Sequence, residues 1–373
     1  MSITGYEFIQ RLESYCPLYL AEKGDPVGLH IGTLNKPVKN IMMTLDVRPA
    51  VVKEAIEKKV DLIIAKHPPI FRPIKRLTTD DFQTQMYADL IKNDIAVYAA
   101  HTNMDIVSPG LNDWFLEKLD ITPDDFVTKT HSFNYKKLVV FTPRSHSGLI
   151  REQMAKIGVG QIGPDYSDCS FTSSGTGRFK PTNGATPYIG EKDNLEVVEE
   201  DRIEFLFSEL IEKEVIQSLI KVHPYEEPAF DIFTVENLKD EYGLGRIGDL
   251  KEPMSLMDFT KKVKTVFHLD GLRLITDTKD KEVKRIAICG GSGEKFYKDA
   301  LKKKADVYIT GDVYYHTAHD MIEEKLSVID PGHYIEELCK EKFVELFNTW
   351  KKENNWDVSF IVSETNTNPF EFI

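Results

Sequence analysis

Three short segments combine histidine with carboxylate residues at spacings that suit a metal site. His67 follows the apolar run "DLIIA" and precedes two prolines, which keep its backbone extended and fix its side-chain direction. "AAHTNMD" places His101 and Asp105 four residues apart, and "IDPGHYIEEL" does the same for His333 and Glu337. If "HYIEEL" starts an α-helix, its His and Glu lie on one face, one turn apart.

Together, His67, Asp105, His333 and Glu337 offer two imidazoles and two carboxylates. This mixed nitrogen and oxygen set suits zinc, iron or manganese better than a structural zinc bound by thiolates. A carboxylate such as Glu337 could also bridge two ions, as in a two-metal hydrolase. Glu336 is expected to point away into solvent. Each segment also has a structural interpretation: a core histidine, an aspartate that caps a turn, and a capped surface helix.

Further polar candidates occur in two other segments. "ITGDVYYHTAHD" adds Asp312, His316 and His319, which could contact the ligands or a substrate, or lie exposed on a helix. "CGGSGEKF" lacks the lysine of a phosphate-binding P-loop and is interpreted as a tight strand-to-helix turn. Arg246 in "GLGRIGD" could reach an anion.

The segments that position these residues alternate between strands and helices. "NIMMTLDV", "DLIIA" and "IAVYAA" are expected strands, and residues 48–60 and 81–94 are expected helices. This alternation predicts a parallel α/β sheet covered on both faces. Ligands bind at the carboxyl ends of strands in such folds, and His67 and His101 stand at two of these ends.

One strand–helix–strand unit occurs twice in the chain. When Ile41 is aligned with Ile286, "MMTLDVRPAVVKEAIEKKVDLIIAKH" matches "AICGGSGEKFYKDALKKKADVYITGD" without a gap, and His67 falls on Asp312. We interpret this as two similar α/β halves whose strand ends converge on one cleft. A chance resemblance between two such units is the alternative.

The expected fold class is α/β, with an insertion between the two halves. Residues 1–126 and 243–373 would form one metal-binding domain. Residues 127–242 hold two further strand–helix–strand passes, which predict a small ferredoxin-like α+β domain. A chain of 373 residues is long enough for more than one core.

Composition restricts the class of protein. The net charge of −13 leaves no overall excess of Lys and Arg for coating nucleic acid. Four cysteines show neither a disulfide framework nor a zinc-ribbon spacing. No apolar stretch approaches the roughly 20 residues that span a bilayer. With no signal segment apparent, a reducing cytoplasm is the expected location.

The chain resembles the GTP cyclohydrolase 1 type 2 homologues, also called Nif-three-like metal proteins. The similar stretches run in family order through both outer segments: "GDPVGLHIG", "TLDV", "AKHPPIF", "HTNMD", "CGGSGEKF", "ITGDVYYH", "GHYIEE" and "NTNPF". In the central segment, "KVHPYEEPAFDI" is similar to the CutA- or PII-like domain that longer bacterial members carry as an insertion.

The resemblance implies two divalent cations in a cleft and subunits that assemble into a ring, usually a homohexamer. It carries the metal ligands onto His67, Asp105, His333 and Glu337, with Glu337 bridging. Zinc is the expected cation, with iron and manganese as alternatives. Most members have His-His-Pro where this chain has Lys66, which removes a ligand of the second ion and adds a positive charge. Lys66 is therefore expected to pair with Glu337 or Asp105.

The family name implies hydrolytic opening of the imidazole ring of GTP by metal-activated water, with formate and dihydroneopterin triphosphate as products. His101 is the candidate catalytic residue for proton transfer, because imidazole titrates near neutral pH. Two functions stay open: a metal-dependent hydrolase of a nucleotide or similar heterocycle, and a non-catalytic regulator that responds to metal or nucleotide. The expected partner is a small nucleotide-like ligand, and neither nucleic acid nor a membrane is expected.

Overall fold

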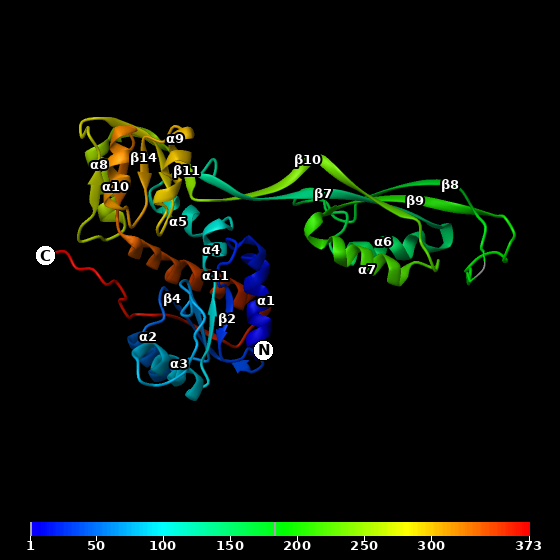
Figure 1. Ribbon diagram of the computed structural model, residues 1–373, viewed down its shortest axis with the longest axis horizontal. Helices are drawn as coiled ribbons and strands as arrows, with labels where there is room; N and C mark the ends of the chain where they lie inside the picture. The colour runs from blue at the N-terminus through cyan, green and yellow to red at the C-terminus, as the bar shows by residue number, and fades with distance from the viewer. Residues whose placement is uncertain (1, 183) are drawn as a thin grey trace. The chain divides into compact units, whose positions relative to one another are not determined.

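The computed structural model describes residues 2–182 and 184–373, and it shows mixed α/β structure with several sheets (Figure 1). The chain divides into two compact units. The outer unit runs to Thr130 and resumes at Tyr242, and the inserted unit is His131–Glu241. Among the helices of the described ranges, none is long and apolar enough to cross a membrane.

The outer unit contains two five-stranded sheets, and the first has the order β16-β4-β5-β6-β2. Its strands β16, β4, β5 and β6 run parallel, and β2 pairs antiparallel with β6. Every residue of β5 and β6 is buried, as expected for apolar strands covered on both faces. The strands are β2 (Gly28–Ile31), β4 (Asn40–Thr44), β5 (Leu62–Ala65), β6 (Ala96–Ala99) and β16 (Ser359–Val362).

Helices pack on both faces of this first sheet. Apolar residues of α2 and α3 form one core with the strands, and Pro49 suits the first turn of α2 because proline needs no N–H partner there. On the other face, Phe8 of α1 packs against Phe347 of α11. The helices are α1 (Gly5–Tyr15), α2 (Pro49–Glu57), α3 (Phe82–Lys92) and α11 (Leu338–Asn354).

The second sheet has the order β11-β13-β14-β15-β12, with β13, β14 and β15 parallel. Its other two strands lie antiparallel to their neighbours. The elements are β11 (Arg246–Ser255), α8 (Leu256–Val266), β12 (Arg273–Ile275), β13 (Glu282–Ile288), α9 (Tyr297–Lys302), β14 (Val307–Ile309), α10 (Tyr315–Glu323) and β15 (Ser327–Asp330).

The two sheets show the same register at the repeated unit. Ile41 pairs with Leu62 in the first sheet, and Ile286 pairs with Val307 in the second. In each sheet an antiparallel strand lies beside the third parallel strand, β2 beside β6 and β12 beside β15. Strands β4, β5 and β6 therefore correspond to β13, β14 and β15. Carboxyl ends from both sheets supply the residues of the candidate site.

Short elements complete the outer unit. After β6 come α4 (Thr102–Ile106) and α5 (Leu111–Lys118), and β1 (Ile3–Thr4) pairs with β3 (Pro37–Val38). The 3₁₀ segments are η1 (Leu18–Leu20), η4 (Glu294–Phe296) and η5 (His333–Glu337).

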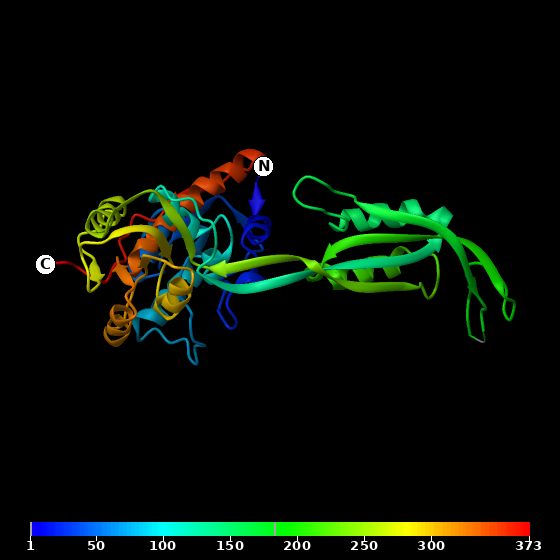
Figure 2. The ribbon, with the colours of Figure 1, turned by 90° about the horizontal axis from the view of Figure 1, so that it is seen from above.

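The inserted unit centres on a four-stranded sheet of order β10-β7-β9-β8 (Figure 2). Helices α6 and α7 share one apolar core with these strands. The element order, βαββαβ, is that of a ferredoxin-like fold. The elements are β7 (Thr128–Pro143), η2 (Arg144–His146), α6 (Ser147–Lys156), β8 (Ser170–Phe179), β9 (Glu196–Ser208), η3 (Glu209–Ile211), α7 (Glu212–Val222) and β10 (Phe230–Leu244).

Candidate metal centre

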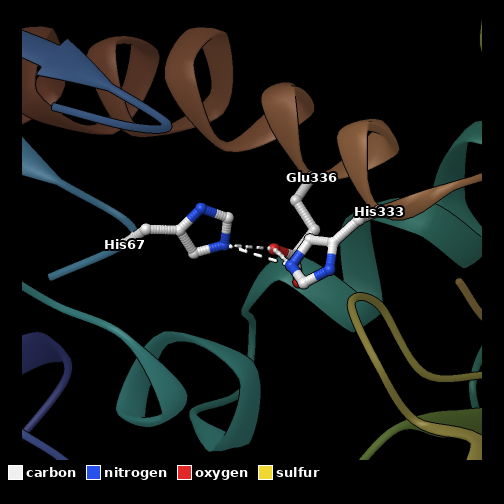
Figure 3. Close-up of side chains that lie close together, drawn as sticks. All are labelled: His67, His333 and Glu336. Atoms are coloured by element: carbon white, nitrogen blue, oxygen red, sulfur yellow. Dashed lines mark hydrogen bonds and ion pairs between the residues drawn. The ribbon is translucent and has the colours of Figure 1, made fainter. Parts of the chain in front are cut away.

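Three side chains of the outer unit bring one ligand atom each to a common point (Figure 3). The Nε2 atom of His67 lies 2.9 Å from Oε2 of Glu336 and 3.3 Å from Nε2 of His333. The same Oε2 atom lies 3.3 Å from Nε2 of His333. His67 comes from the end of β5, whereas His333 and Glu336 come from η5, so the two sheets meet at this point.

The local helix type decides which glutamate joins the group. His333–Glu337 is a 3₁₀ segment, in which three residues complete a turn. Glu336 therefore lies over His333, and its side chain is only 2% exposed. The prediction that Glu336 points into solvent is wrong, because it assumed α-helical spacing. Glu337 stands at the end of the segment, 45% exposed and 3.3 Å from Lys340, outside the group of three.

A carboxylate orients each histidine of the group through the opposite ring nitrogen. Nδ1 of His67 donates to Asp46 at 2.8 Å, and Nδ1 of His333 donates to Asp312 at 2.6 Å. Asp46 follows β4, and Asp312 follows β14. Histidines that bind metals typically donate their second N–H in this way, which fixes the tautomer and aims the other nitrogen at the ion.

The donor set fits a cation. Nδ1 of both rings donates to a carboxylate, so in the neutral rings both Nε2 atoms are acceptors. These two nitrogens and a carboxylate oxygen face one another, and a positive charge among them is needed to offset their repulsion. In the absence of an ion, a proton can supply it. Burial lowers the pKa of His333, but hydrogen bonds to Asp312 and Glu336 outweigh this and raise it to about 10. Those to Asp46 and Glu336 likewise overcome burial and raise the pKa of His67.

Lys66 and Asp105 lie directly beside this group. Nζ of Lys66 lies 2.9 Å from Oδ2 of Asp105 and 3.7 Å from Oε1 of Glu336. The predicted pairing of Lys66 with Asp105 is therefore confirmed. Burial lowers the pKa of Lys66, but the two negative charges outweigh it and raise the pKa. Burial acts to raise the pKa of Glu336, yet Lys66 and the two histidines hold it well below its usual range.

Asp105 has one unsatisfied oxygen. Its Oδ1 atom is buried and finds no hydrogen-bond partner among the residues that the structure describes, whereas Oδ2 accepts from Lys66. A buried carboxylate oxygen without a partner is costly, and a nearby cation would relieve that cost. Asp105 is thus adjacent to the group but outside its three converging ligand atoms.

A cleft of about 310 Å³ opens beside the metal centre. Its lining includes three histidines: His67, His101 and His333. The ring centroids of His67 and His101 are 5.8 Å apart, and Nδ1 of His101 donates to Asp25 at 2.7 Å. His101 therefore lines the cleft with its ring oriented by Asp25, and it does not belong to the group formed by His67, His333 and Glu336. The remaining lining residues are Asp46, Val47, Arg48, Pro68, Pro69, Phe71, Phe82, Gln83 and Met86.

The other sequence candidates have different surroundings. Arg246 is 2% exposed and donates to Asp113 and to four backbone carbonyls, so it is not accessible to an anionic ligand as the sequence suggested. His316 and His319 are exposed on α10 and pack edge-on against Tyr315. Gly291, in the turn after β13, allows close approach: a Cβ there would lie 3.0 Å from Oε1 of Glu336.

Several residues of the centre were not singled out in the sequence. Glu336 was excluded on the assumption of an α-helix, and Asp25 lies within the family-like stretch "GDPVGLHIG" but was not itself identified as a site residue. Asp46 had an available signal, because it follows a strand in the same way as His67 does. Thr367, which donates to Asp46, lies in the C-terminal segment and carries no local sign of its partner.

Comparisons with known proteins agree with this architecture. The family model described as Duf34/NIF3 (NGG1p interacting factor 3) matches residues 3–369. A Bacillus subtilis protein named GTP cyclohydrolase 1 type 2 homolog is 46% identical over 372 residues, covering 100% of this chain and 99% of that protein. A Listeria innocua protein of the same name is 43% identical, covering 99% and 98%.

Solved structures also match over the whole chain. The crystal structure of a Bacillus cereus protein related to NIF3 superposes with a TM-score of 0.88 at 39% identity, covering 100% of this chain and 99% of that one. A Staphylococcus aureus structure gives a TM-score of 0.81 at 29% identity with the same coverage. These matches confirm the family resemblance identified in the sequence.

Proposed function

Because the chain belongs to the Duf34/NIF3 family, we propose that it is a metal-dependent hydrolase whose divalent cation is bound by His67, His333 and Glu336. The observation that supports this proposal most is the convergence of three ligand atoms, two of them on rings already oriented by carboxylates. Two imidazoles and one carboxylate form a ligand set used by catalytic zinc, and iron or manganese suit it as well.

The proposed chemistry divides between the cation and the cleft. A cation of this kind supplies a water activated for attack at neutral pH. His101 lines the same cleft, and with Nδ1 held by Asp25 its Nε2 is available to take up or release a proton. The Asp25 contact keeps the ring in one orientation, which positions that nitrogen for transfer.

The cleft supports a nucleotide-like heterocycle as the substrate class. Phe71 and Phe82 are 63% and 64% exposed and offer apolar faces to a planar ring. Arg48 in the same lining offers a guanidinium to an anionic group. GTP, opened to formate and dihydroneopterin triphosphate, is the specific reaction that we propose to test first, because the relatives are named as GTP cyclohydrolase homologs.

The test combines metal analysis with an assay. Purified protein is analysed for bound metal, then incubated with GTP and saturating Zn²⁺, Fe²⁺ or Mn²⁺ while formate and fluorescent pterin are measured. We expect Glu336→Gln to abolish cation binding and product formation. Glu337→Gln, at a half-exposed glutamate next in sequence that pairs with Lys340, is the matched control and should bind metal as the wild type does.

The outcomes separate the two parts of the proposal. Loss of metal in Glu337→Gln but not in Glu336→Gln would contradict the ligand assignment. Bound metal without product from GTP or related heterocycles would overturn the hydrolase and favour a non-catalytic, metal-responsive regulator. Assembly into a homohexameric ring is a further proposal, tested by light scattering after size-exclusion chromatography.

A further inference from the structure

Lys66 places a fixed positive charge inside the metal centre. Its side chain is 1% exposed, and its ammonium lies between Asp105 at 2.9 Å and Glu336 at 3.7 Å. Buried lysines are rare unless paired, and here both partners are carboxylates of the centre itself. Lys340 is also buried, but it pairs with Glu337, whose side chain is 45% exposed and lies outside the centre.

The two oxygens of Glu336 face different positive groups. Oε2 faces His67 and His333, and Oε1 faces the Lys66 ammonium. A carboxylate that bridges two metal ions divides its oxygens in the same manner, with one oxygen directed at each ion. In this chain the ammonium of Lys66, the residue directly after β5, takes the second of these two positions.

Asp105 turns toward the same ammonium. Its Oδ2 atom accepts from Lys66, and its backbone oxygen accepts from Asn112 at 3.0 Å, which holds this part of α4 in place. Lys66 therefore occupies the space between the two carboxylates that a cation would otherwise need to bridge.

We propose that Lys66 serves as a built-in replacement for a second cation, so that each chain binds one divalent ion and excludes another. This inference rests on the proposed function, because it assumes that His67, His333 and Glu336 hold the ion. Asp105 and Glu336 together carry two negative charges. The Lys66 ammonium already balances part of that charge, so a second divalent ion would have to enter a buried site directly beside a like charge.

The ammonium also prepares the site for its single ion. By holding Oε1 of Glu336, it leaves Oε2 directed at the two histidines before any metal arrives. Ligands whose orientation is fixed in advance bind metal with less reorganisation. Removal of the charge would therefore change two properties together: the number of ions bound and the orientation of Glu336.

The test is the metal stoichiometry of Lys66 variants. Chelator-treated full-length protein is titrated with Zn²⁺ by calorimetry, and bound zinc is measured after gel filtration. The wild type should bind one ion per chain. Lys66→His, which exchanges the ammonium for a ligand, should bind two, and Lys66→Gln should bind a second ion more weakly than the first. Lys340→Gln should bind one.

A second measurement reports on the pair of ions directly. Mn²⁺ bound to Lys66→His should give an electron paramagnetic resonance spectrum with spin coupling between two ions, whereas the wild type should give that of an isolated ion. Circular dichroism checks that each variant is folded. If Lys66→His does not fold, Lys66→Gln and the wild-type stoichiometry decide the question.

Each result bears on one proposal. Two ions per wild-type chain, or one ion in folded Lys66→His and Lys66→Gln, would overturn the role of Lys66 while leaving metal binding intact. A wild-type chain that binds no divalent ion would instead overturn the proposed function.

Discussion

Thr367 donates a hydrogen bond from its Oγ1 to Oδ2 of Asp46 over 2.5 Å, and this contact joins the C-terminal segment to the metal centre. Asp46 in turn accepts from Nδ1 of His67, so the threonine stands behind the residue that orients a proposed ligand. Glu54 of α2 holds the start of the same segment by accepting from Ser363 and Thr365. The C-terminal segment is therefore a positioning element of the centre.

Removal of the Thr367 hydroxyl should weaken cation binding. Thr367→Val leaves Asp46 with one fewer donor, so the carboxylate and the ring of His67 become less well fixed. Replacement of such an outer partner typically lowers metal affinity roughly 10-fold or more. Zinc titration measures the effect, and Thr367→Ser, which keeps the hydroxyl, should retain most of the wild-type affinity. Equal affinities in the Val and Ser variants would rule out this positioning role.

Attachment of the C-terminal segment should depend on acid pH through Glu54. Burial acts to raise the pKa of Glu54, but hydrogen bonds from Thr365, Glu364 and Lys58 outweigh it and lower the pKa to about 2. A lowered pKa means that this stability is present above the ordinary value of 4.5 and is lost as the pH falls toward about 2.

The matching variant is Glu54→Gln. At neutral pH it should lower the free energy of unfolding by roughly 2 kcal/mol, because it removes hydrogen bonds to a charged group. The difference from the wild type should shrink as the pH falls from about 4.5 to about 2. Urea denaturation across that range measures it, and a difference independent of pH would contradict the assignment.

Arg246 should matter for stability and not for cation binding. It links β11 to α4 and α5 through Asp113 and the carbonyls of Ile106 and Val107. Arg246→Met leaves a largely buried carboxylate unpaired and should cost roughly 3–5 kcal/mol of unfolding free energy. Arg285→Met, which removes more exposed pairs with Asp124 and Asp249, should cost less, about 1 kcal/mol. Zinc affinity of the folded Arg246→Met protein should equal that of the wild type.

Gly291→Ala should disturb the centre by steric contact. Gly291 has a φ of +63°, and a Cβ there would lie 3.0 Å from Oε1 of Glu336 and 3.4 Å from Nε2 of His333. We expect a several-fold loss of zinc affinity. Gly24→Ala is the matched control, because Gly24 also has a positive φ of +86°, but a Cβ there would meet no atom of residues 2–182 and 184–373 within 4 Å. Both variants should lose roughly 1 kcal/mol of stability from backbone strain. Only the first should bind zinc less tightly.

Patterns within the sequence were sufficient for the alternating α/β architecture. Buried apolar strands and amphipathic helices have short-range signatures, and the unit at Ile41 and Ile286 repeats without a gap because both copies keep the same register between their first two strands. The strand end and the two prolines that follow it indicated His67 as a candidate ligand, and the Pro331-Gly332 turn before η5 indicated His333.

Tertiary structure decided what those patterns leave open. The choice between Glu336 and Glu337 depends on whether one turn is α-helical or 3₁₀, and such short segments follow the packing around them more than their own sequence. Lys66 meets Asp105, and Thr367 meets Asp46, only because separate strands and the C-terminal segment fold onto one another. A sequence shows which side chains can bind a cation or balance its charge, whereas the distances that pair them arise from contacts between residues far apart in the chain.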